Sequence, residues 1–185
     1  MGERYHAIIC EGSAEQAIIE ILLEHHCLII ENDDYLIDNG PIRIRGAKEF
    51  CDKYLGKNFG GKIDLYRIMD SRNENFNFGS RRYEKIFAEK INVVNVITPP
   101  EIEVLMIICE NKYDHFANKG KSAKPSDYCK DVLGLKGVKS FDFVRSYFQD
   151  IHILLKAVKE LHGKKKSSLP KDARTLYDLL KPEYK

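Results

Sequence analysis

Two acidic residues each come directly after a short, mostly apolar segment of the sequence. Glu11 follows residues 5–10 (YHAIIC), and Asp70 follows residues 63–69 (IDLYRIM). Carboxylates that are brought together repel one another and are costly to bury unless a cation or a proton offsets their charge. Mg²⁺ prefers oxygen ligands and often binds one or two carboxylates together with substrate phosphates. The two acids therefore predict a magnesium site if the fold brings them together.

The segments that precede the two acids are expected to be strands of one sheet. Strand and helix patterns alternate along the first part of the chain, with strands expected at 5–10, 63–69 and 93–97 and helices from Ser13, over 47–55 and over 81–90. Parallel neighbours need crossover connections, so this alternation predicts an α/β fold with a mostly parallel sheet and helices on both faces. The active crevice of such sheets lies at the carboxyl ends of the strands, which is where Glu11 and Asp70 would both lie.

Three local patterns add detail to this expected fold. Ser13 with Gln16 three residues later predicts a capping box at the start of the first helix. Residues 38–41 (DNGP) are a strong turn signal between two apolar runs and predict a hairpin or an irregular insertion. Residues 28–30 (LII) could form a short strand.

The chain is expected to comprise an α/β domain (residues 1–115) and a basic helical extension (residues 116–185). Beyond Asp114 the alternation ends, and a Lys-rich loop precedes helical patterns near 126–133, 141–162 and 170–180. Residues 119–185 carry 16 Lys and Arg against 8 Asp and Glu, whereas residues 1–118 carry 14 against 20. An acidic body suits a divalent cation, and a basic extension suits a polyanion.

Composition and motifs exclude several classes of protein. With 43% apolar and 31% charged residues, the chain has the composition of a soluble globular protein. Its longest apolar runs are far shorter than a membrane span, and its N-terminus does not have the pattern of a signal peptide, so we expect a cytoplasmic protein with no membrane partner. The five cysteines form no CxxC pair, which favours reduced thiols. The sequence has neither a P-loop nor a dinucleotide-binding fingerprint.

Three short motifs resemble those of a known family. Residues 8–15 (IICEGSAE), followed by an apolar helix, resemble the first motif of Toprim domains, and among these the OLD-family and RloB-like nucleases of phage-defence systems. Residues 66–70 (YRIMD) occupy the place of the strand that leads into the Asp-x-Asp motif of that family. Residues 98–104 (TPPEIEV) are similar to the Pro-containing turn of RloB-like proteins and single out Glu103. The resemblance covers roughly residues 5 to 110 and implies a Toprim-like, Rossmann-like sheet.

The resemblance also implies an activity and roles for these residues. Toprim chemistry is the cleavage or transfer of phosphodiester bonds, which here implies a nuclease that depends on Mg²⁺ or Mn²⁺. Asp70 would coordinate the metal, and Glu11 would act as a metal ligand or as a general acid or base. Glu15 and Glu103 are candidates for further metal ligands.

One position departs from the family pattern. Arg72 stands where the family has its second Asp. If Arg72 turns towards the crevice, its guanidinium could contact the substrate phosphate in a bidentate way. A cation there would weaken a two-metal site, which leaves three alternatives: another acid substitutes, only one metal binds, or catalysis has been lost.

Nucleic acid, either DNA or RNA, is the partner that the resemblance implies. The basic extension offers lysines that could meet backbone phosphates, namely Lys119, Lys121, Lys124, Lys164, Lys165 and Lys166. An ATPase or another defence-system subunit is a further possible partner.

A competing hypothesis is a catalytically degenerate, Toprim-like module that binds nucleic acid or a protein partner. Each candidate residue also has a structural explanation. An acid such as Glu11 is favourable beside a helix N-terminus, Asp70 could simply open a turn, and lysines are favourable at a helix end.

Overall fold

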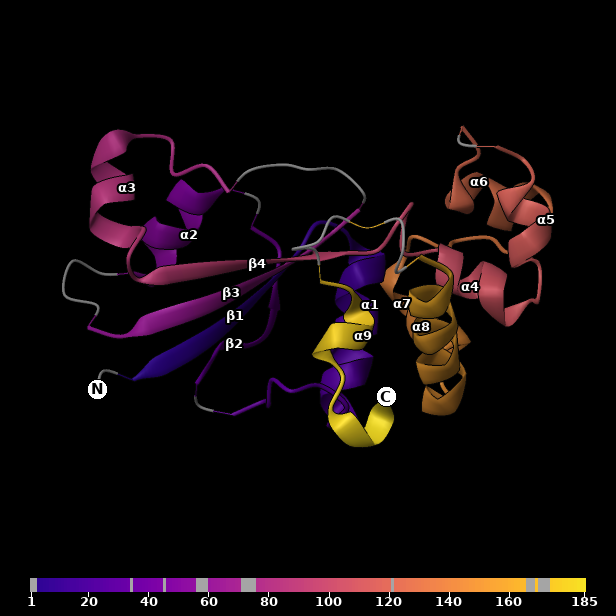
Figure 1. The fold of residues 1–185 in the computed structure, drawn as a ribbon, viewed down its shortest axis with the longest axis horizontal. Coiled ribbons are helices and arrows are strands. Elements are labelled where there is room, and N and C mark those ends of the chain that lie inside the picture. The colour runs from indigo at the N-terminus through magenta and orange to yellow at the C-terminus, as the bar shows by residue number, and fades with distance from the viewer. Residues whose placement is uncertain are drawn as a thin grey trace.

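A four-stranded parallel sheet forms the centre of the molecule (Figure 1). The computed structural model describes residues 3–33, 35–44, 46–55, 60–70, 76–120, 122–165, 169 and 174–185. The strand order is β2-β1-β3-β4, and all neighbouring strands are parallel. The strands are β1 (Arg4–Cys10), β2 (Leu36–Ile42), β3 (Lys62–Met69) and β4 (Ile91–Ile97). The expected α/β fold with a parallel sheet is therefore confirmed.

Helices cover both faces of this sheet. They are α1 (Ser13–Glu24), α2 (Ala47–Tyr54), α3 (Arg81–Phe87), α4 (Val104–Cys109), α5 (Tyr113–Ala117), α6 (Pro125–Asp131), α7 (Phe141–Tyr147), α8 (Ile151–Lys165) and α9 (Leu176–Leu179), followed by the 3₁₀ turn Pro182–Tyr184. Successive residues of a strand point to opposite faces. Ala7 and Ile9 accordingly join the core beneath α2 and α3, whereas Ile8 and Cys10 join the larger core that contains α1.

The C-terminal helices share that larger core with the sheet. Val144 of α7, Leu154 of α8 and Leu176 of α9 belong to the same cluster of buried residues as α1 and α4. The backbone also connects the two parts, because Ile97 N donates to Arg174 O at 2.7 Å. The helices α4 to α8 gather on the side of the molecule where the strands end (Figure 1). The basic extension is therefore packed against the carboxyl end of the sheet.

Of the hairpin and the irregular insertion predicted near residues 38–41, the hairpin is wrong. Residues 36–42 form one edge strand, β2, which runs parallel to β1. Asp38 and Asn39 have φ values of 62° and 52°, and the β1–β2 register shifts there. Asp and Asn tolerate this left-handed conformation better than most residues, so the turn signal produces a bulge and not a chain reversal.

Other local predictions also need correction. Gly12, not Ser13, is the N-cap of α1, and the Gln16 side chain bonds Glu20. The expected short strand at 28–30 is reduced to an isolated bridge between Leu28 and Leu180. The helix expected over 141–162 is divided into α7 and α8, and Asp150 Oδ1 accepts from His152 N at the start of the second helix.

Neither a membrane-spanning helix nor a disulfide occurs in the part of the chain that the structure describes. No described helix combines the length and the apolar character needed to cross a bilayer. All five cysteines are free, and Cys10, Cys27, Cys51 and Cys129 are buried.

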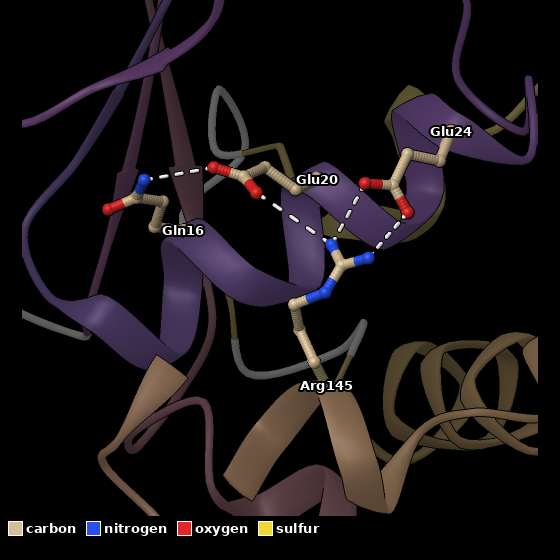
Figure 2. Close-up of polar contacts among 4 residues, drawn as sticks. All are labelled: Gln16, Glu20, Glu24 and Arg145. Carbon is tan, nitrogen blue, oxygen red and sulfur yellow. Dashed lines mark hydrogen bonds and ion pairs between the residues drawn. The ribbon is translucent and has the colours of Figure 1, made fainter. Parts of the chain in front are cut away.

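An ion-pair clamp fixes α7 against α1 (Figure 2). Arg145 Nη1 and Nη2 donate to the two carboxylate oxygens of Glu24 at 2.9 and 2.8 Å. Arg145 Nη1 also lies 3.7 Å from Glu20 Oε2, and Gln16 Nε2 donates to the other oxygen of Glu20 at 2.9 Å. Bidentate Arg–carboxylate pairs have a specific geometry, so this clamp sets how α7 lies on α1.

Replacing Arg145 by Ala is expected to lower the free energy of unfolding by about 1 kcal/mol, because a bidentate pair that joins two helices is worth more than a single contact within one helix. Urea denaturation measures this loss. Lys48→Ala removes the solvent-exposed pair between Lys48 and Asp52 within α2 and should cost less than Arg145→Ala. Equal losses would mean that the bidentate geometry adds nothing to the α1–α7 contact.

Candidate functional site

The carboxyl ends of three neighbouring strands meet at one edge of the sheet. Cys10 pairs with Ile68, so Glu11 and Asp70 follow the ends of adjacent strands. Ile97 pairs with Met69, and Thr98 N donates to Met69 O at 3.0 Å. Parallel pairing makes strand ends coincide regardless of their separation in the sequence. The structure therefore brings Glu11 and Asp70 to the same edge.

Three more acids lie around this edge. Glu15 is in the first turn of α1 and is 8% exposed, whereas Glu101 and Glu103 lie in the turn between β4 and α4. The Glu15 carboxylate folds back over Gly12, because a Cβ at that glycine would lie 2.5 Å from Glu15 Oε2. A side chain at position 12 would therefore require the flexible Glu15 carboxylate to move away.

These five acids, Glu11, Glu15, Asp70, Glu101 and Glu103, are called the carboxylate cluster below. Burial raises the pKa of Asp70 to about 6, and the negative charges of Glu15, Glu101 and Glu11 act in the same direction. Burial also raises the pKa of Glu103 to about 7, with further contributions from Glu101 and Glu15. The acids therefore repel one another across the strand ends.

The pKa of Glu15 is raised as well, first by burial and then by the charge of Glu11. Backbone hydrogen bonds at Glu15 and Gly12 oppose this rise by stabilising the ionised carboxylate. The start of α1 thus offsets part of the repulsion within the cluster.

Lys139 brings a positive charge to the cluster. Its Nζ lies 3.8 Å from Glu101 Oε2 and 3.9 Å from Glu103 Oε1. The lysine side chain is 64% exposed, whereas that of Glu103 is 4% exposed. Sequence reasoning singled out neither Lys139 nor Glu101. A lysine in a Lys-rich segment carries no local signal of such a contact, and Glu101 is marked only by its place two residues before Glu103.

The donor chemistry of the cluster fits a hard divalent cation. Carboxylate oxygens are the ligands that Mg²⁺ and Mn²⁺ prefer. Glu101 Oε2 is buried without a hydrogen-bond partner, which is the state of an oxygen that a cation would satisfy. Among the described residues, no three Asp, Glu, His or Cys side chains are already arranged to hold a metal ion. A metal ion would therefore be held by one or two of these carboxylates, as is common for Mg²⁺, or by more of them if the side chains move closer together.

Not every candidate residue can be placed. Arg72, with residues 71–75, lies outside the described residues, as do Lys121 and Lys166. Of the residues next to Asp70 in the chain, the structure therefore describes those that precede it in β3.

The remaining candidate lysines lie around α5. Lys119 and Lys124 are exposed in the connection from α5 to α6. Lys164 Nζ lies 4.8 Å from the centre of the Tyr113 ring, and Lys165 Nζ lies 5.9 Å from it. Lys164 also pairs with Asp114 and Glu160, both at 3.5 Å, so part of its charge is already compensated.

Comparison with known proteins does not assign the chain to a family. No protein-family model matches it, and the searches of curated proteins and of solved structures give no significant match.

The raised pKa values predict how stability depends on pH in metal-free protein. A carboxyl group with a higher pKa in the folded chain favours folding while it is protonated. Its contribution is complete below the unfolded pKa of about 4 and is lost as the pH rises through the folded pKa. The contribution of these carboxyl groups to the stability of the wild-type protein should therefore fall between about pH 4 and pH 8. Asp70→Asn, which cannot ionise, should lose about 1 kcal/mol less over this range, after allowance for solvent screening of a half-buried group.

Urea denaturation at about pH 4 and about pH 8, with a chelator present, measures the loss of stability in the wild type and in Asp70→Asn. Asp131→Asn, at an exposed position of α6, is the matched control and should follow the wild type. The same pH dependence in Asp70→Asn and wild type would show that Asp70 ionises normally.

Proposed function

We propose that this protein is a metal-dependent nuclease that uses Mg²⁺ or Mn²⁺ to cleave phosphodiester bonds in DNA or RNA. The observation that carries the proposal is the position of Glu11 and Asp70 at adjacent strand ends, next to the buried acids Glu15 and Glu103. A cluster of this kind attracts a divalent cation, and the polyanionic substrate would supply further oxygen ligands. The resemblance to OLD-family and RloB-like proteins suggests phage defence as the setting.

The residues of the cluster take distinct roles in this proposal. Glu11 and Asp70 would hold the ion, with Glu15, Glu101 and Glu103 available as further ligands. A divalent ion supplies charge neutralisation at the phosphate and lowers the pKa of water. Glu103, with a pKa of about 7, can hold or release a proton near neutral pH and is therefore suited to general acid or base work. Arg72 would contact the phosphate.

The lysines around α5 would bind the nucleic-acid backbone. Lys119 and Lys124 come from the connection after α5. Lys164 and Lys165 come from the end of α8, and their Nζ atoms lie over the Tyr113 ring. Contacts of this kind are sequence-independent and sensitive to salt. An ATPase or another defence-system subunit is a further partner within this proposal.

The second candidate function is a binding module with a degenerate site. Lys139 favours it, because a cation of the chain itself already compensates Glu101 and Glu103. This alternative predicts salt-dependent binding of nucleic acid without metal-dependent cleavage.

Cleavage of plasmid, single-stranded DNA and RNA in the presence of Mn²⁺ tests the nuclease. Glu11→Gln and Asp70→Asn are each expected to lower the rate by about a hundredfold or more, because each removes a charged metal ligand. Asp131→Asn should retain wild-type activity. Metal-dependent cleavage that survives both substitutions at the cluster would exclude this site, and binding without any cleavage would favour the degenerate module.

Salt dependence of binding tests the lysines under either function. The double variant Lys119→Gln/Lys124→Gln should reduce the slope of log K against log salt by about 1.4, because each lysine neutralises about one phosphate and each phosphate contributes about 0.7 on single strands. Fluorescence anisotropy with labelled single strands measures the slope. Lys62→Gln/Lys85→Gln removes the same charge at the start of β3 and on α3, and should leave the slope unchanged. Equal slopes in the two double variants would show that Lys119 and Lys124 do not contact the nucleic-acid backbone.

A further inference from the structure

Lys139 is held at the carboxylate cluster by its neighbours in the chain. It belongs to residues 132–140, the segment that connects α6 with α7. Val138 is 5% exposed and packs in the larger core. Ser140 caps α7 by accepting from Phe143 N, and its own N donates to Gly137 O at 2.7 Å. The backbone is therefore anchored on both sides of Lys139, which leaves the flexible side chain as the part that can move.

The helix that follows Lys139 is tied to the helix that carries Glu15. The Arg145 clamp joins α7 to Glu20 and Glu24 of α1, and Glu15 lies in the first turn of α1 (Figure 2). The position of Lys139 relative to the cluster is consequently fixed by a direct α1–α7 contact.

Lys139 makes only long-range ion pairs with the cluster, and its ammonium group is exposed. Its distances of 3.8 and 3.9 Å to Glu101 and Glu103 exceed the 2.7–2.9 Å that is typical of charge-assisted hydrogen bonds. The ammonium group is largely exposed and can leave into solvent, whereas the two carboxylates, 17% and 4% exposed, cannot follow it. Lysine is suited to such a role, because it is a compact charge on a flexible stem.

We propose that Lys139 is a built-in counter-ion that compensates the carboxylate cluster in the metal-free protein and is displaced when a divalent cation binds. This inference rests on the proposed metal site and concerns its regulation by the C-terminal part of the chain. An ammonium group and a divalent cation that approach the same oxygens repel each other. Lys139 therefore weakens metal binding while it stabilises the metal-free fold.

The test compares Mn²⁺ affinity in the wild type, three lysine variants and Asp70→Asn by isothermal titration calorimetry, at about pH 8 so that Asp70 and Glu103 are ionised. Lys139→Met keeps the length of the side chain and removes its charge, and should bind Mn²⁺ about five- to tenfold more tightly than wild type. Lys139→Arg keeps the positive charge, and its Mn²⁺ affinity should stay within about twofold of that of the wild type. Lys136→Met is the matched control from the same segment and should also leave the affinity unchanged.

Thermal unfolding provides a second readout that does not depend on catalysis. Without metal, Lys139→Met should melt at a lower temperature than Lys136→Met, because the buried Glu103 and the partly buried Glu101 lose their counter-ion. Mn²⁺ should then raise the melting temperature of Lys139→Met more than that of wild type.

The outcomes separate this inference from the proposed function. Equal or weaker Mn²⁺ binding by Lys139→Met, with binding lost in Asp70→Asn, would overturn the counter-ion role and leave the metal site intact. Binding that is unaffected by Asp70→Asn, or no binding by any of the proteins including Lys139→Met, would overturn the metal site and the counter-ion role together.

Discussion

Repulsion between carboxylates at the carboxyl edge of the sheet is the constraint on which the rest of this site depends. The parallel pairing of β1, β3 and β4 leaves no freedom to separate the residues that follow these strands. Asp70 and Glu103 respond with pKa values near 6 and 7. At neutral pH these two groups are therefore partly protonated. A positive charge at the edge, from Lys139 or from a bound cation, favours their ionised form.

The C-terminal helices supply both packing and charge to this edge. They continue the core that begins on α1, and Arg174 extends the hydrogen bonding of β4. Lys139 comes from the same part of the chain and lies near Glu101 and Glu103. The electrostatic balance of an edge built by the first half of the sequence is therefore set in part by the second half.

The elements that carry Glu11 and Asp70 could be predicted from the sequence for a simple physical reason. Buried parallel strands are continuous apolar runs, and parallel pairing aligns their ends whatever their distance along the chain. Contacts between segments have no comparable local signal. The approach of Lys139 to Glu101 depends on the packing of α7 against α1, which no spacing of charges reveals. The residues at 38–41 show the opposite difficulty, because Asp and Asn at positive φ serve a bulge as well as a turn.

The energetics of the cluster bear on the choice between a catalytic and a degenerate site. Structural carboxylates normally have partners. Arg145 pairs with Glu24, and Asp64 accepts from Asn92 and pairs with Arg4; these contacts lower the pKa of both acids. Asp70 and Glu103 show shifts in the other direction, and Glu101 retains a buried oxygen without a hydrogen-bond partner. Groups that reduce stability in this way are concentrated at functional sites, where a ligand compensates them. Lys139 offsets part of this destabilisation and a bound divalent cation would offset more of it, so this physical argument favours a site that binds a cation.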